Sequence, residues 1–339
     1  MTSDIIQFLV AAVVIVFAGG ALTQFGEIIS NRSKMGGMLV GGILIAGATS
    51  LPELAININV VRKGSADLAV GSLVGSNLFN LLILAVCDLT RYSKGHMLSR
   101  TSAGNALSAI TSTGLASLAA IFIFLGPQLG SSTFLRAGPG SYLLAFVYLV
   151  GIRMIYFEQG NASKDPDASD EENKSVIARL RHMGLKGGIL GFIGAATVIL
   201  IAAPFLATAA QNLSDKTGLG GTFFGSVFVG LSTSLPEVVT VFTAIRMKAF
   251  EIAVGNIFGS NCFNILLLVP LDFVFEGSLL SAAASTHVYT ALCGVLVTAV
   301  VILGQLFDVE KKHRPFLEPD AWMAIVLIVA GFTGLYFIK

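Results

Sequence analysis

The chain has 339 residues, of which 54% are hydrophobic and 12% are charged, with a mean hydropathy of +0.82. Soluble domains carry about 25% charged residues, and a single soluble core could not bury this much apolar surface. We therefore expect an all-α integral membrane protein embedded in a lipid bilayer. The net charge of +1 also excludes the strongly basic surface with which proteins bind nucleic acid.

Ten segments of the chain can cross a bilayer, whose hydrocarbon core of about 30 Å requires about 20 apolar residues per helix. The expected spans are residues 5–24, 37–61, 67–88, 103–126, 139–157, 187–208, 221–245, 251–274, 283–307 and 318–338. The second and the seventh span contain Pro52 and Pro236. We expect each proline to break its helix, because proline removes one backbone hydrogen bond and crowds the preceding turn.

The linker between the fifth and the sixth span is the clearly polar part of the chain. Eight of the 17 residues from Glu158 to Lys174 are charged, and six of those are acidic. The link is too short for an independent domain, which needs at least about 50 residues. We interpret it as a solvated linker in preference to a regulatory cation site. The linker divides the chain into residues 1–157, 158–186 and 187–339.

The distribution of basic residues predicts the orientation of the chain. Ten spans place both termini on the same side of the membrane. If that side is outside, 16 of the 21 Lys and Arg residues lie in or beside cytoplasmic segments. The positive-inside rule therefore favours a multi-pass protein of the plasma (inner) membrane with both termini outside.

The two halves of the chain repeat each other with an offset of 184 residues. Residues 49–53 and 233–237 both read TSLPE, while residues 71–80 read GSLVGSNLFN and residues 255–264 read GNIFGSNCFN. Each half holds five spans, so the second copy enters the membrane from the opposite side, and the repeats are inverted. Inverted repeats with interrupted helices are typical of transporters whose binding site lies near the membrane midplane.

Glu53 and Glu237 occupy equivalent places about midway along their spans. A charged side chain at the bilayer centre costs at least about 2.5 kcal/mol, so an acid there indicates a functional site. Carboxylates buried only for helix packing are the alternative. The same acid in both repeats favours a pair of ion ligands.

Neutral oxygens accompany the two acids. Thr49 and Glu53 are i, i+4 neighbours on one helical face, and the second repeat places Thr233 and Glu237 in the same way. Their hydroxyls could bond back to their own helix, but beside a proline and a buried acid we favour ion ligation. The remaining candidate ligands are the serines beside these threonines and the i, i+4 pairs of the second motif: Ser50, Ser234, Ser76, Asn80, Ser260 and Asn264.

All of these candidates offer hard oxygen atoms. Two carboxylates neutralise one divalent cation, and calcium accepts six to eight mixed oxygen ligands more readily than magnesium does. Smaller groups of the same oxygens suit sodium. We expect no bound cofactor and no enzymatic activity, because no HExxH motif is present and no histidine lies near the serine-bearing motifs.

At these motifs the sequence resembles the sodium/calcium exchanger family of the cation/calcium exchanger superfamily, in its prokaryotic form. The resemblance rests on GATSLPE with GSLVGSNLFN and on GLSTSLPE with GNIFGSNCFN. It implies a monomeric antiporter with calcium in a central site between spans two, three, seven and eight, sodium around it, and spans one and six sliding across the rest. It also implies that the ten candidates named above are the ion ligands.

One position departs from the pattern of the resemblance. Many sodium/calcium exchangers carry an acid at the end of the second GSN motif, where this chain has Asn264. With one carboxylate fewer, a proton-coupled antiporter of calcium or another cation stays open beside the sodium-coupled one. A cation channel also remains an alternative, because acids line cation pores as well.

Overall fold

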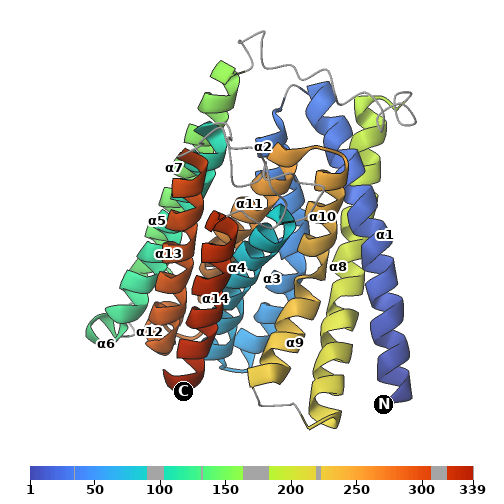
Figure 1. Ribbon diagram of the computed structural model, residues 1–339. Helices are drawn as coiled ribbons and strands as arrows, with labels where there is room; N and C mark the ends of the chain where they lie inside the picture. The colour runs from blue at the N-terminus through green and yellow to red at the C-terminus, as the bar shows by residue number, and fades with distance from the viewer. Residues whose placement is uncertain are drawn as a thin grey trace.

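The computed structural model describes residues 1–33, 35–89, 103–130, 133–162, 183–218, 223–306 and 319–338. These residues form a helical bundle in which nine helices are long and apolar enough to cross a membrane. The two ends of the chain lie at the same end of the bundle, which an even number of crossings requires (Figure 1). Most of the expected linker, residues 163–182, lies outside the described residues.

The helices follow the expected spans closely. The first half comprises α1 (Thr2–Ser33), α2 (Gly37–Leu39), the π-helix η1 (Val40–Ile45), α3 (Ala46–Arg62), α4 (Ala66–Asp88), α5 (Ala103–Phe124), α6 (Gly126–Leu129) and α7 (Pro139–Ala162). The second half comprises α8 (Leu185–Lys216), α9 (Phe223–Thr233), α10 (Leu235–Arg246), α11 (Phe250–Val274), α12 (Leu279–Ala282), α13 (Thr286–Leu306) and α14 (Pro319–Ile338). The second span is α2, η1 and α3 in one run, and the seventh is α9 followed by α10.

The expected break at a proline is confirmed in the seventh span and wrong in the second. Ser234 separates α9 from α10 with φ −82° and ψ 6°, and Pro236 lies in the first turn of α10. Pro52, in contrast, lies inside α3, which continues through it to Arg62. A proline removes one backbone hydrogen bond, and the helix continues where the flanking residues keep their own helical bonds.

The irregularity of the second span is instead η1, one turn before the TSLPE motif. Its glycines approach the backbone of α11: a Cβ on Gly41 would clash with the carbonyl of Ile252, and one on Gly259 would clash with Gly42. A Cβ on Gly255 would lie 2.8 Å from the carbonyl oxygen of Met38. The GxxxG ridge of α11 therefore packs against the second span, as the small-residue pattern predicts.

The glycines of the equivalent ridge on α4 make other contacts among the described residues. A Cβ on Gly71 would lie 2.7 Å from the ring of His287 in α13, and one on Gly75 would have no atom of the described residues within 4 Å.

Helices α1 and α8 pack side by side along one flank of the bundle (Figure 1). Their shared apolar contact is formed by Ala11, Ile15, Ala202, Ala203 and Leu206. On its inner side α1 meets α10, where the hydroxyl of Thr23 donates to the carbonyl of Thr240 at 3.3 Å. A Cβ on Gly19 would lie 2.9 Å from Val239, so the two backbones approach closely.

Asp272 closes the end of α11. Its carboxylate accepts hydrogen bonds from the backbone N–H of Gly138, the hydroxyl of Ser141 and the backbone N–H of Leu279, each at 2.6 Å. These donors belong to the first turns of α7 and α12 or to the residue just before α7, so the carboxylate caps two helix N-termini.

Candidate cation site

The four helices that carry the repeated motifs meet in the interior of the bundle. Helix α3 carries the first TSLPE motif, the second extends from the end of α9 into α10, and α4 and α11 carry the two GSN motifs. Nine of the ten candidate ligands are buried, while Thr233 at the end of α9 is partly buried. Polar side chains that are up to about 200 residues apart in the sequence thus lie in the protein interior. A polar group without a hydrogen-bond partner costs the most free energy there.

The two acids come from opposite repeats and lie close together. Glu53 is 6% exposed and Glu237 is 2% exposed. They are near enough for their charges to interact, and the hydroxyl of Thr49 lies beside the carboxylate of Glu237. Two like charges repel strongly when they are buried. The two glutamates can therefore both be ionised only with a cation beside them, and otherwise at least one must carry a proton.

Several buried oxygens of the candidate ligands have no hydrogen-bond partner among the described residues. They are Ser50 Oγ, Glu53 Oε2, Asn80 Oδ1, Glu237 Oε2 and Asn264 Oδ1. Nearly all buried polar atoms in native proteins are paired, so each exception needs a physical reason. All five atoms are hard oxygen donors, the ligand type that hard cations prefer.

The threonines of both motifs donate back to their own helices. Thr49 Oγ1 donates to the carbonyl of Ala46 at 3.2 Å, and Thr233 Oγ1 donates to the carbonyl of Gly230 at 2.9 Å. The sequence reasoning treated such back-bonding as an alternative to ligation. The two are compatible, because a hydroxyl that donates its only proton still has oxygen lone pairs to offer a cation.

Four asparagines join the two GSN motifs. Asn80 Nδ2 donates to Asn261 Oδ1 at 2.9 Å, and Asn264 Nδ2 donates to Asn77 Oδ1 at 3.0 Å. Asn77 and Asn261, which are not among the ten candidates, accept these two bonds. They link α4 to α11 across the repeats, because the pair faces the partner helix and not the TSLPE segments.

A further polar chain was missed by sequence reasoning. Asn256 Nδ2 donates to Thr240 Oγ1 at 2.7 Å, and Thr240 Oγ1 is 3.0 Å from the carbonyl of Glu237, to which it donates. Ser260 Oγ donates over 3.5 Å to Asn256 Oδ1. Extending the i, i+4 series of the second motif one turn towards the N-terminus would have found Asn256, because it continues the face of Ser260 and Asn264.

The described site combines two carboxylates with neutral hydroxyl and amide oxygens. Two negative charges balance one divalent cation, and the mixture of oxygens matches the ligand types of calcium. The same set can also bind monovalent cations or protons in turn, because its charge is not balanced by any basic side chain among the candidates.

Comparison with known proteins places this chain in a family. The sequence pattern of the family described as sodium/calcium exchanger protein matches residues 3–156 and 187–338. The inner membrane protein YrbG of Escherichia coli is 24% identical over 298 residues, which are 87% of this chain and 86% of YrbG. The sodium/calcium exchanger MaX1 of Methanosarcina acetivorans is 24% identical over 366 aligned positions, which cover 100% of both chains.

A solved structure shows the same fold. The sodium-calcium exchanger NCX_Mj superimposes with a TM-score of 0.66 at 16% sequence identity. The match covers 99% of this chain and 97% of that chain. The fold is therefore that of a known exchanger over its whole length.

Proposed function

The chain belongs to the sodium/calcium exchanger protein family, and we propose that it is a secondary active antiporter that exchanges calcium for sodium by alternating access. Membership makes it a cation/calcium antiporter and not an enzyme. The proposal adds the coupling ion. The observation that supports it most is the set of five unpaired, buried oxygen atoms from both repeats, with a carboxylate in each.

We further propose that the ten candidate residues are the ion ligands. They are Thr49, Ser50, Glu53, Ser76 and Asn80 of the first repeat with Thr233, Ser234, Glu237, Ser260 and Asn264 of the second. The helices form two inverted five-helix repeats, residues 1–157 and 187–339, joined by the linker 158–186. The protein works as a monomer in the plasma (inner) membrane with both termini outside.

Two findings support alternating access. Ser234 interrupts the seventh span three residues before Glu237, and η1 changes the helical geometry of the second span one turn before Thr49. Departures from regular α-helix at these positions allow each motif to move relative to the rest of its span. The small residues by which α1 contacts α10 and η1 are consistent with the sliding of α1 and α8 that the family resemblance implies.

Proton-coupled exchange is the second candidate, and Asn264 favours it. Where many relatives carry a third acid this chain has an amide, which removes one negative charge from the site. The two remaining carboxylates can be discharged by protons as well as by sodium, because desolvation favours the neutral form of an acid.

Transport by purified protein in liposomes decides between these functions. Vesicles loaded with sodium should take up calcium when diluted into sodium-free medium at constant pH. Uptake that ignores sodium and follows an imposed pH gradient would replace sodium by protons as the coupling ion. Calcium flux that requires neither opposing gradient would indicate a channel.

A further inference from the structure

Asn77, Asn80, Asn261 and Asn264 form a closed hydrogen-bonded set, which we name the asparagine quartet. Besides the two side-chain bonds described above, Asn77 Nδ2 donates to the backbone carbonyl of Asn261 at 3.3 Å. Asn261 Nδ2 donates in turn to the backbone carbonyl of Asn77 at 3.4 Å. Each bond in one repeat has its counterpart 184 residues away. The quartet therefore joins the two repeats symmetrically.

The backbone carbonyls determine which way the first pair of amides points. A carbonyl oxygen only accepts hydrogen bonds, and its second lone pair remains available inside a helix. Asn77 and Asn261 must therefore turn their NH₂ groups towards these carbonyls. A reversed amide would place two oxygens against each other in the buried interior, where unpaired polar groups are costly.

The orientation of the first pair fixes that of the second. Because its NH₂ group already donates to a carbonyl, Asn77 presents Oδ1 to Asn264. Asn264 can bond to that oxygen only by donating from its own NH₂ group. The same holds for Asn261 and Asn80. The amide oxygens of Asn80 and Asn264 are consequently left over, and both are buried with no hydrogen-bond partner in the part of the chain that the structure describes.

We propose that Asn77 and Asn261 are positioning residues that set the ligand chemistry of the cation site. By holding the NH₂ groups of Asn264 and Asn80, they present two neutral oxygens to the cation and keep N–H donors away from it. This inference rests on the proposed function and extends it to residues that do not touch the cation. It also explains the amide at position 264, because an ionised acid there would face the oxygen of Asn77.

Calcium binding tests the inference without relying on transport. Equilibrium dialysis with radioactive calcium is carried out on the purified full-length protein and on Asn77→Leu, which has a similar shape but cannot accept a hydrogen bond. Loss of a group that orients a metal ligand weakens binding by about 10- to 100-fold, and we expect a change in this range. Asn105→Leu is the matched control, since Asn105 is fully buried in α5 and does not belong to the quartet.

A double-mutant cycle separates positioning from general packing. Asn77→Leu combined with Asn264→Leu should bind calcium no more weakly than Asn264→Leu alone, because the oriented ligand is already absent. Asn77→Leu combined with Asn80→Leu should show the sum of both effects, because Asn80 is held by Asn261. If these residues only stabilised the bundle, the effects of the substitutions on calcium binding would not depend on which asparagines are hydrogen-bonded to each other.

The outcomes distinguish this inference from the proposed function. If the unmodified protein binds no calcium, the proposed function is overturned. If it binds calcium and folded Asn77→Leu binds equally well, the role of Asn77 is overturned while the function stands. Should Asn77→Leu not fold, Asn77→Ser removes the same acceptor with a smaller side chain, and equal binding by that variant would be equally decisive.

Discussion

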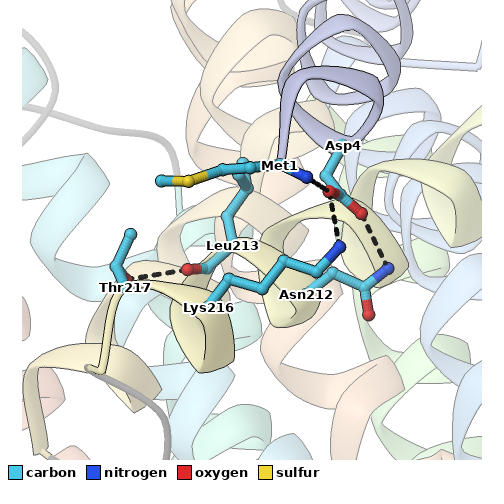
Figure 2. A network of polar contacts seen from close by, with 6 residues as sticks. All are labelled: Met1, Asp4, Asn212, Leu213, Lys216 and Thr217. Atoms are coloured by element: carbon cyan, nitrogen blue, oxygen red, sulfur yellow. Dashed lines mark hydrogen bonds and ion pairs between the residues drawn. The ribbon is translucent and has the colours of Figure 1, made fainter.

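Lys216 Nζ lies 2.7 Å from Asp4 Oδ2, so an ion pair joins the last turn of α8 to the first turn of α1 (Figure 2). The same carboxylate is 2.8 Å from the N-terminal amine, and Asn212 Nδ2 donates to its other oxygen at 3.3 Å. These bonds connect the first turn of α1 to the end of α8, and the apolar contact joins the same two helices further along.

We expect α1 and α8 to move as one unit during transport. Cysteines replacing Asp4 and Lys216 and joined by a short bifunctional maleimide should leave calcium uptake largely intact. A disulfide between Gly20→Cys and Thr243→Cys should block uptake, because it fixes α1 to α10, and a Cβ on Gly20 would lie 3.8 Å from Thr243 Oγ1. Uptake in liposomes before and after reduction is the measurement. Equal inhibition by both links would contradict a joint movement.

Replacing either acid should abolish calcium transport. We expect Glu53→Gln and Glu237→Gln each to reduce uptake by about 100-fold or more, because removing one partner of a buried charge interaction costs about 3–5 kcal/mol. Glu27→Gln is the matched control, since Glu27 is a buried acid of α1 whose carboxylate accepts a bond from Asn31. Near-normal uptake by either site variant, with normal expression, would rule out that acid as a ligand.

Asn264→Asp should make calcium binding depend on pH. Protonated, the new acid can donate to Asn77 Oδ1 as the amide does; ionised, it adds a third negative charge to the site. We therefore expect the calcium affinity of the variant, relative to that of the unmodified protein, to increase as the pH rises through the range in which the new acid ionises. Titration of calcium binding at several pH values measures the difference. Parallel pH profiles would show that position 264 does not face the cation.

The two GxxxG ridges should respond differently to the same substitution. Gly259→Ala should destabilise the protein by about 1–3 kcal/mol, because the added methyl group meets the backbone of Gly42. Gly75→Ala should be close to neutral, because no atom of the described residues lies within 4 Å of the added group. Thermal unfolding in detergent gives the comparison. Equal losses would mean that both ridges are packed in solution.

The orientation of the chain can be tested without transport. Single cysteines replace the exposed residues Arg136 and Lys186 in intact cells. The first should react with a membrane-impermeant maleimide from outside, and the second only after the membrane is opened. The reverse result would invert the proposed topology, and labelling of both from one side would contradict the number of spans between them.

Local composition is sufficient to predict the spans and the two acids. Each span extends over about 20 residues, and their hydropathy can be calculated from the sequence without knowing which residues they contact. Glu53 and Glu237 can be recognised as candidate functional residues in the same way, because an acid within an apolar span is unusual whatever it packs against. Helical spacing alone also predicts that Thr49 shares a helix face with Glu53, and Asn80 with Ser76.

The contacts between the repeats were decided only by the tertiary structure. Whether Pro52 interrupts its helix depends on the bonds of neighbouring turns, and the position of η1 depends on how closely Gly41 and Gly42 approach α11. The pairing of Asn77 with Asn264 depends on the relative register of two helices whose motifs are 184 residues apart. Helical periodicity defines which face a residue occupies, but it carries no information about the height at which another helix meets that face.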